Sequence, residues 1–415
     1  MTRSDTRLTS VTPTGPSVAS SVELPFATSM RSTVGIEWEM GLVDDDTGDM
    51  RQAAPAILKA LHAEDGQHPH IKQEFMQNTV ELVSGVSHSV SQAGSDLYDA
   101  ANQVRAVADP MRVGLISAGT HPFAAWRAQK ITEHERYLGL VNRAQVIGRQ
   151  TAIFGVHTHV GVESRDKVLP LLNSMLVYQP YLLALSASSP FWDGKYSGYA
   201  SMRSVLFQQL PTAGLPYQFT SWDELSQYAA DLTNTGVISS FDEVRWDIRP
   251  SCQYGTLETR VCDGASNLKE LLALSALTHC LVEYLSQVYD DNPSALPTLP
   301  PWFVTENKWR AARYGLDAEI ITSAAGNQVK IRNAIPSLVE KLSPTAEKLN
   351  CQNELAAINE ILDLGANYER QLRVHNAALA AGASNHEALE TVVSHLVAEM
   401  RADQPLPQSY SNMWH

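Results

Sequence analysis

The segment Thr33–Asp44, TVGIEWEMGLVD, constrains the fold more than any other part of this sequence. Its apolar residues recur at every second position, and they are Val34, Ile36, Trp38, Met40 and Leu42. A period of two predicts a β-strand with one buried face. Glu37 and Glu39 lie on the other face, about 7 Å apart, because side chains at i and i+2 of a strand point the same way. The strand therefore requires an apolar layer on one side and places two carboxylates on the other.

Strand patterns are concentrated in the first two-thirds of the chain, and helical patterns follow in the last third. Further strands are predicted within Lys72–Val86, Gly114–Phe123, Ile153–Val162 and Trp246–Asp263. Helices are predicted at Ala54–Glu64, from Ser91 to just before Pro110, at Val168–Ser188, and after Asn267, with new helix starts at Ser343 and Ser384. This order predicts an α+β fold, in which helices group on one side of a mostly antiparallel sheet.

The charge and the cysteines limit the partners and the compartment. The formal net charge is −14, so neither a nucleic acid nor an anionic membrane is expected as a partner. An anionic substrate would need metal ions or local arginines. The 4 cysteines show no CxxC spacing, which is typical of reduced cysteines in a cytoplasmic protein. The sequence also lacks a continuous apolar run long enough for a membrane span and the apolar region of a signal peptide.

Several predicted strands carry ionisable residues on the face away from their apolar residues. His157 and His159 share such a face in VHTHVG, flanked by glycines. Glu258 and Arg260 share one in TLETRVCD, and Glu81 lies among apolar residues in TVELVSGV. A face with so many carboxylates would repel itself unless cations bound to it. Oxygen ligands with an occasional histidine favour Mg²⁺ or Mn²⁺, while zinc remains an alternative.

Each of these groups also has a purely structural interpretation. Glu37 and Glu39 could be a solvated strand face, and the two histidines could be hydrogen-bonded surface residues. Glu258 and Arg260 could simply neutralise each other. The functional interpretation is that Glu258 binds a metal ion while Arg260 binds an anionic group, for which its planar guanidinium is suited.

Other arginines are candidates for anion binding. A P-loop is excluded, because the chain has no Gly-x-x-x-x-Gly-Lys-[Ser/Thr] motif. Arg203 lies in the Gly- and Pro-rich segment Ser188–Gly214, which is typical of a binding loop or lid, and Arg249 lies in the last strand region. Both could bind a phosphate or carboxylate group, as of a nucleotide cofactor, or form surface ion pairs. Arg310 and Arg313, three residues apart on a predicted helix, either reach the site or brace the sheet.

The order of these motifs resembles the type 2 glutamate–cysteine ligase family, the carboxylate–amine ligases. The resemblance rests on GIEWEM, TVELVSGV, AGTHPFAAW, FGVHTHVGV, SASSPFW, GYASMR, PTAGLP, WDIRPS, GTLETRVCD and NKWRAARYGLDA. It extends over nearly the whole folded chain, from about Val34 to the C-terminal helices. Each motif alone is unspecific, but their combination is highly specific.

The resemblance implies a glutamine-synthetase-like fold, with a curved antiparallel sheet, helices packed on its convex side and the active site on its concave face. It implies that ATP phosphorylates the side-chain carboxylate of glutamate, and that an amine such as cysteine then attacks the acyl phosphate. ADP and phosphate would be released, and divalent Mg²⁺ or Mn²⁺ would assist. The family includes members with weak glutamate–cysteine activity, so the physiological amine and acid stay open. The resemblance favours a homodimer.

The resemblance also implies roles for individual residues. Five of them match metal ligands of the more distant glutamate–cysteine ligases, namely Glu37, Glu39, Glu81, His157 and Glu258. Arg260 matches the arginine that contacts the transferring phosphoryl group of ATP, and Arg203 matches a substrate or phosphate contact. Phosphoryl transfer needs positioning and charge neutralisation rather than a protein nucleophile, which agrees with the absence of a nucleophile motif.

Two alternatives to a ligase stay open from the sequence. The first is a metal-dependent hydrolase that uses His157, His159 and glutamates around a metal-bound water. The second is a catalytically idle member, although every matched site residue is present. For the domain organisation, we expect a disordered leader over residues 1–30, a single catalytic domain over 31–404 and a tail over 405–415. The domain would be sheet-rich over 31–264 and helical over 265–404.

Overall fold

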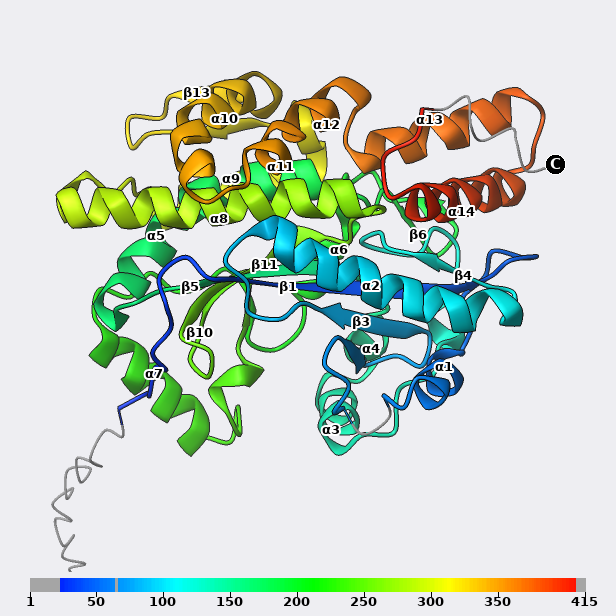
Figure 1. Ribbon diagram of the computed structural model, residues 1–415, viewed down its shortest axis with the longest axis horizontal. Helices are drawn as coiled ribbons and strands as arrows, with labels where there is room; N and C mark the ends of the chain where they lie inside the picture. The colour runs from blue at the N-terminus through cyan, green and yellow to red at the C-terminus, as the bar shows by residue number, and fades with distance from the viewer. Residues whose placement is uncertain (1–22, 64–65, 408–415) are drawn as a thin grey trace, which may run out of the picture.

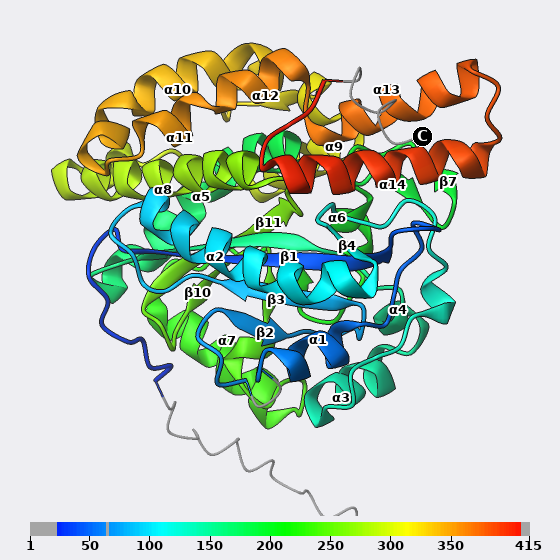
Figure 2. The same ribbon diagram turned by 45° about the vertical axis from the view of Figure 1, so that its right-hand side comes forward.

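A seven-stranded antiparallel sheet forms the centre of the molecule (Figures 1 and 2). This computed structural model describes residues 23–63 and 66–407. The strand order is β10-β11-β5-β1-β3-β2, and β4 pairs with the C-terminal half of β1. The strands are β1 (Val34–Asp44), β2 (Ile71–Gln73), β3 (Thr79–Val83), β4 (Val113–Ile116), β5 (Gly155–Gly161), β10 (Ile248–Ser251) and β11 (Thr256–Asp263).

Short strands pair outside this sheet. They form the two-stranded pairs β6 (Phe191–Trp192) with β7 (Lys195–Tyr196), β8 (Ala213–Gly214) with β9 (Arg245–Trp246), and β12 (Glu319–Ile321) with β13 (Gln328–Lys330). The sequence pattern predicted none of these pairs separately, because strands of two or three residues are too short to show a period.

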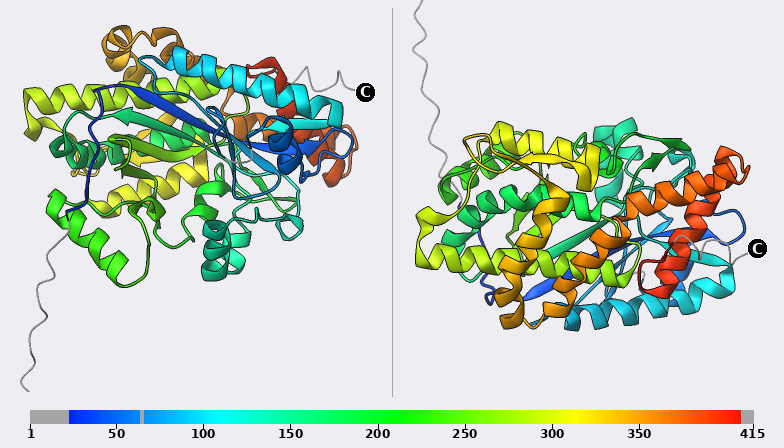
Figure 3. Two further views of the ribbon diagram at one scale, coloured as in Figure 1. Left: turned by 60° about the horizontal axis from the view of Figure 1, so that its bottom comes forward. Right: turned by 90° about the horizontal axis from the view of Figure 1, so that it is seen from above.

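Long helices cover one face of the sheet, with α5 and α8 above it in Figure 1 and α2 in front. Further helices form an outer layer over α5 and α8, as the view from above in Figure 3 shows. The helices of these layers are α2 (Val90–Ala108), α5 (Arg165–Ser186), α8 (Leu268–Asp291), α9 (Pro301–Tyr314), α10 (Ile331–Lys348), α11 (Gln352–Ala356), α12 (Ile358–Leu364), α13 (Asn367–Ala380) and α14 (Asn385–Ala402).

Helices also lie on the opposite side of the sheet, where α3 and α7 are seen below it in Figure 1 and in the left view of Figure 3. The remaining helices are α1 (Ala54–Ala60), α3 (Glu135–Ala144), α4 (Val146–Arg149), α6 (Met202–Phe207) and α7 (Trp222–Asn234). The predicted α+β architecture with an antiparallel sheet is confirmed. In addition to the helices grouped on the core side, α3 lies on the side of the candidate site.

The alternation in β1 has the predicted consequence. Its five alternating apolar side chains, Val34, Ile36, Trp38, Met40 and Leu42, are at most 1% exposed. They belong to a core cluster that continues through α2, α5 and α8 to Met400 of α14. Full burial of such a side chain contributes roughly 1.5–3 kcal/mol, so this face fixes the strand orientation. Since the sheet-rich and helical parts share this core, we infer that they form one domain.

Two core helices, α5 and α8, are long and apolar enough to cross a membrane by length and composition. The sequence pattern had predicted no such span. In the most apolar 18-residue stretch of each helix, 72% of the residues of α5 and 78% of those of α8 are buried inside the protein. Both helices pack against each other and against strands of the sheet. Their apolar composition is therefore explained by the core, which is the usual reason for a helix without a polar face.

Two boundary predictions are corrected. The helix start predicted at Ser343 is wrong, because α10 runs through Pro344 without a break. Packing of its apolar face against α8 outweighs the loss of one backbone hydrogen bond. In the expected leader, residues 23–30 contact the folded body: the Leu24 carbonyl accepts a hydrogen bond from the Trp222 indole, and the Ala27 amide donates to the Cys252 carbonyl. Residues 1–22 and most of the expected tail, 408–415, lie outside the described residues.

Candidate active site

The register of the sheet brings the predicted acidic residues together. Glu37 of β1 lies opposite His157 of β5. Glu39 of β1 lies opposite Glu81 of β3. On the next strand, Glu258 of β11 lies opposite His159 of β5. All point away from the apolar core, because each alternates with buried apolar neighbours along its strand. Four strands thus contribute to one polar surface.

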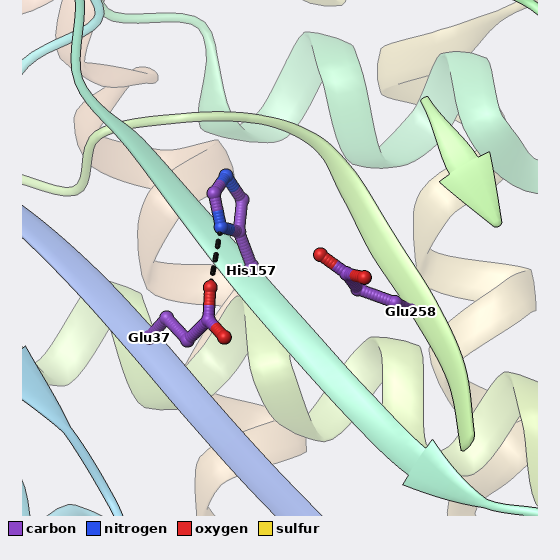
Figure 4. Close-up of side chains that lie close together, drawn as sticks. All are labelled: Glu37, His157 and Glu258. Atoms are coloured by element: carbon purple, nitrogen blue, oxygen red, sulfur yellow. Dashed lines mark hydrogen bonds and ion pairs between the residues drawn. The ribbon is translucent and has the colours of Figure 1, made fainter. Parts of the chain in front are cut away.

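Two groups of potential metal ligands lie on this surface and share His157. One consists of Glu37, His157 and Glu258, and the other of Glu39, Glu81 and His157. Within each group, one ligand atom per residue lies within 4.8 Å of the others. Figure 4 shows the first group, in which β1, β5 and β11 each supply one side chain. The five residues predicted as metal ligands are therefore the five that the two groups contain.

The first group is held by hydrogen bonds. The Glu37 carboxylate accepts from His157 Nδ1 at 2.8 Å and from His159 Nε2 at 3.1 Å. Burial by itself would raise the pKa of Glu37, but these two histidines outweigh it and hold the pKa well below the usual range. Burial and the nearby Arg260 lower the pKa of His157 to about 4, so its ring is neutral at neutral pH. A neutral ring that donates from Nδ1 keeps Nε2 available as a ligand.

The second group has few partners and a strong electrostatic conflict. Glu39 accepts one hydrogen bond, from the Gly155 amide at 2.5 Å, and Glu81 has no hydrogen-bond or salt-bridge partner among the described residues. Burial, followed by repulsion from Glu74, raises the pKa of Glu39 to about 8. Burial and the carboxylates around it raise the pKa of Glu81 well above its usual value. A divalent cation would relieve this repulsion, and its hard oxygen ligands are already in place.

Arginines lie beside these carboxylates. Glu258, which is fully buried, accepts hydrogen bonds from Arg249 Nε at 2.6 Å and from Arg260. Burial by itself would raise the pKa of Glu258, but Arg260 and Arg249 outweigh it and lower the pKa. Arg203 of α6 is 3% exposed and donates to the Arg260 carbonyl. The Nε atoms of Arg203 and Arg260 are buried without a hydrogen-bond partner, so both retain donor capacity.

A cavity opens beside Glu39 and His157 of the second group. Its volume is about 160 Å³, it is open to solvent, and Arg203 and Arg260 line it beside Glu39 and His157. Among the described residues it is also lined by Glu74, Phe75, Met76, Thr79, Arg136, Tyr137, Leu140, Thr151, Ile153, Phe207, Leu210 and Arg245. Its walls combine a polar, charged floor with apolar side chains, which is usual for small-molecule sites.

Some predicted residues do not line the cavity. Arg249 was predicted to bind the nucleotide. Its guanidinium instead donates hydrogen bonds to Glu258 and to the carbonyls of Asp242 and Val244, and it does not line the cavity. Arg310 pairs with Glu306 on α9, and Arg313 donates to the Gly198 carbonyl. Arg313 therefore braces the Gly-rich segment.

Other residues of the site were missed by the sequence analysis. Glu74 follows β2, and burial raises the pKa of its carboxyl. It lies in the same strand region as Glu81, and its charge among apolar neighbours was the available signal. Arg136 and Tyr137 of α3 and Arg245 of β9 had no such signal, because these elements reach the cavity only through tertiary packing. The Gly-rich segment contributes to the cavity lining, since α6 within it carries Arg203 and Phe207.

The hydrolase alternative is not supported by the position of His159. Its Nδ1 pairs with Thr256 at 2.9 Å and its Nε2 with Glu37 at 3.1 Å, so both ring nitrogens are engaged. Burial disfavours the protonated ring, but Glu258 and Glu37 outweigh it and raise the pKa of His159. Of the two groups of potential ligands in the described part of the chain, neither includes this residue.

Gly155 leaves the space that Arg203 occupies. A Cβ atom at this position would lie 2.1 Å from Arg203 Nη2 and 2.7 Å from its Cζ. We expect Gly155→Ala to displace the guanidinium and to lower kcat by roughly 100-fold, the usual cost of a displacement of about 1 Å at a reacting centre. Steady-state kinetics of the ATP-dependent reaction that the resemblance implies would measure this loss.

Gly35→Ala is the matched control, since Gly35 lies on the same face of the sheet and an added Cβ would make an ordinary contact, 3.8 Å from His159 Cβ. It should retain nearly full activity. If Gly155→Ala were as active as Gly35→Ala, Arg203 would have no role in positioning the substrates.

The family model and the curated relatives assign the chain to a class of protein, the ligases that join a carboxylate to an amine. The chain belongs to Glutamate-cysteine ligase family 2 (GCS2), whose model matches residues 33–395. It is accordingly an enzyme that forms a carbon–nitrogen bond. This family is the one that the motif order resembled.

Relatives match the chain over nearly their whole length. A protein of Arthrobacter sp. (strain FB24) named "Putative glutamate--cysteine ligase 2-1" is 48% identical over 386 residues, which are 92% of this chain and 99% of that protein. A second relative, from Leifsonia xyli subsp. xyli (strain CTCB07), is named "Putative glutamate--cysteine ligase 2". It is 50% identical over 379 residues, which are 91% of this chain and 98% of that protein.

Solved structures show the same fold at low sequence identity. Glutamate–cysteine ligase of Francisella tularensis, solved in complex with AMP, has a TM-score of 0.66 and 13% identity, covering 91% of this chain and 90% of its own. A bifunctional glutathione synthetase of Pasteurella multocida has a TM-score of 0.59 and 18% identity, covering 88% of this chain and 51% of its own.

Proposed function

We propose that this ligase uses ATP to phosphorylate the side-chain carboxylate of glutamate and then joins the glutamyl group to an amine such as cysteine. The observation that carries the proposal is the cavity in which the carboxylates of Glu39 and Glu74, the imidazole of His157 and the guanidiniums of Arg203 and Arg260 face one space. Two anionic substrates must meet in this reaction. A site with separate acidic and basic parts can bind a metal–nucleotide complex on one and an anion on the other.

The donor set fits divalent Mg²⁺ or Mn²⁺. Glu39 and Glu81 would hold one ion with His157, since their carboxylates have free oxygens and raised pKa values. Glu37 and Glu258 would contribute to a second, although the Glu258 oxygens already bind two arginines. Bound ions would neutralise the phosphates of ATP and the acidic surface together.

The residues themselves account for the remaining requirements. Arg260 places a guanidinium, held by Glu258, beside the acidic groups, where charge develops on the transferring phosphoryl group. Arg203, fixed against Gly155 and the Arg260 carbonyl, would orient the substrate carboxylate that accepts this group. A carboxylate oxygen attacks the γ-phosphorus and ADP leaves. The amine nitrogen then attacks the acyl carbon of the γ-glutamyl phosphate, and phosphate leaves as the amide bond forms.

The direct test is an ADP-release assay with Mg²⁺, ATP and glutamate against a panel of amines that includes cysteine. ADP release should depend on glutamate, on one amine and on the divalent cation, and mass spectrometry should detect the γ-glutamyl amide. If glutamate stimulated no turnover with any amine, glutamate would not be the acid. If ADP were released without Mg²⁺ or Mn²⁺, the metal assignment would be wrong.

Two properties of the molecule follow as proposals. We place the enzyme in the cytoplasm, where ATP is available and where the four free cysteines would stay reduced. We also propose a homodimer, which analytical ultracentrifugation would distinguish from a monomer.

A further inference from the structure

A second cavity adjoins the first at the end away from the sheet. The two cavities share three lining residues, Arg136 and Leu140 of α3 and Arg245 of β9. The inner cavity continues to the metal-ligand candidates, and the outer one opens between α3 and the region of Pro211 and Ser239. The two arginines therefore lie where the two cavities meet.

These arginines have unused hydrogen-bonding capacity. The Arg136 side chain makes no hydrogen bond or salt bridge within the described part of the chain, and it is exposed to solvent. Arg245 is partly buried, and its side chain has one hydrogen-bond partner among the described residues, the Glu243 carbonyl at 2.8 Å from Nη1. Glu135 and Glu243 also line the outer cavity, but neither carboxylate forms a salt bridge with these arginines. Buried or partly buried cations normally have such a partner.

The local charge balance points the same way. Burial, followed by repulsion from Arg136 and Arg260, lowers the pKa of Arg245 to about 10. At the other end of the cavity negative charge is in excess, because the carboxylates of Glu39 and Glu74 line it and Glu81 lies close to both. One end of the site is thus suited to a cation and the other end, where Arg136 and Arg245 line both cavities, to an anion.

We propose that Arg136 and Arg245 together bind a free carboxylate of an amino-acid substrate, and so make this ligase selective for substrates that carry a carboxylate remote from the reacting group. The proposal rests on the function proposed above. The phosphates of ATP have the acidic, metal-binding surface as their site, whereas a remote carboxylate has no metal ion to neutralise it. A guanidinium is planar and supplies several N–H donors in a geometry that matches a carboxylate.

The test combines variants of the protein with substrates that lack the carboxylate. Arg136→Gln and Arg245→Gln are expected to raise the KM of one amino-acid substrate by about 10- to 100-fold, as for the loss of a charge-assisted hydrogen bond, and to leave the KM of ATP unchanged. Arg245→Lys should restore part of the affinity. The control is Arg143→Gln, because Arg143 lines only the outer cavity and donates to the Val237 carbonyl.

Substrate analogues identify which carboxylate is bound. For one of two pairs, glutamate with its α-amide or cysteine with cysteamine, the wild-type KM should be much lower for the compound that carries the carboxylate. The Gln variants should show similar KM values for both compounds of that pair. Equal discrimination by wild type and variants would overturn the proposal. A raised KM for ATP with unchanged amino-acid KM values would also overturn it, since the arginines would then bind a phosphate.

A binding measurement separates this proposal from the proposed function. Glutamate and cysteine are titrated calorimetrically into wild type and into Arg245→Gln, with a nonhydrolysable ATP analogue and Mg²⁺ present. This measurement requires no turnover. Weaker binding of one carboxylate ligand to the variant supports the arginine pair even if no ligation product is found. Unchanged affinity for both ligands would overturn it, whatever the enzyme is found to ligate.

Discussion

Arg260→Ala is expected to lower kcat for ligation by about 10³-fold or more, because an arginine that neutralises a transferring phosphoryl group contributes a factor of this order. Arg260 lines the cavity, and the carboxylate of Glu258 fixes its guanidinium. The fold should persist, since Glu258 keeps Arg249 and His159 as charge partners. Single-turnover measurements of ADP formation, with circular dichroism as a check of folding, give the effect.

Two further variants show whether a loss of rate in Arg260→Ala is specific to the Arg260 guanidinium. Arg260→Lys keeps the charge but not the planar fork, and should recover only a small part of the rate. Arg310→Ala removes an arginine that pairs with Glu306 outside the cavity, and should leave the rate nearly unchanged. If Arg260→Ala kept a rate close to that of Arg310→Ala, Arg260 would not act on the phosphoryl group.

Glu81→Gln should have opposite effects on stability and on activity. Glu81 has no hydrogen-bond or salt-bridge partner among the described residues, and burial and neighbouring carboxylates raise its pKa. Its amide would carry no charge, so we expect a higher Tm for the metal-free variant than for wild type at pH 8. The same change removes a proposed metal ligand. We expect it to weaken the apparent affinity for Mg²⁺ by at least about 100-fold, because losing a residue that only hydrogen-bonds to a ligand already costs up to about that factor.

The pH dependence of this stability difference has a definite sign. In the unfolded chain Glu81 loses its proton near pH 4.3, whereas in the folded protein it holds the proton to higher pH. The stability of wild type relative to Glu81→Gln therefore falls as the pH rises above about 4.3. Thermal melts in EDTA at pH 5 and pH 8 should show the larger gain at pH 8. A lower Tm of the variant at pH 8 would contradict the electrostatic account.

Mg²⁺ provides the matching control. At pH 8 it should raise the Tm of wild type, since a bound cation removes the repulsion among Glu39, Glu74 and Glu81, and should scarcely affect Glu81→Gln. Equal shifts in the two proteins would place the ion elsewhere.

Much of the acidic surface could be predicted from local pattern. In β1, β5 and β11, apolar residues alternate with ionisable ones, and a strand has only two faces. Once Val34 and Trp38 are buried, Glu37 and Glu39 must point away from the core. The five predicted metal ligands accordingly fall into the two groups that share His157. The limit of this reasoning is seen at Arg249, whose strand placement was right but whose donors are used inside the protein.

The sequence by itself determined the α+β class, the buried face of each long strand and the family, because these depend on periodicity and on the order of short motifs. Only the tertiary structure decided which strands are neighbours, and hence that Glu39 lies opposite Glu81 and Glu37 opposite His157. It also decided that α3 and β9 bring Arg136 and Arg245 to the cavity. The physical reason is that pairing across a sheet and the packing of distant elements are nonlocal, whereas a period of two is written in neighbouring residues.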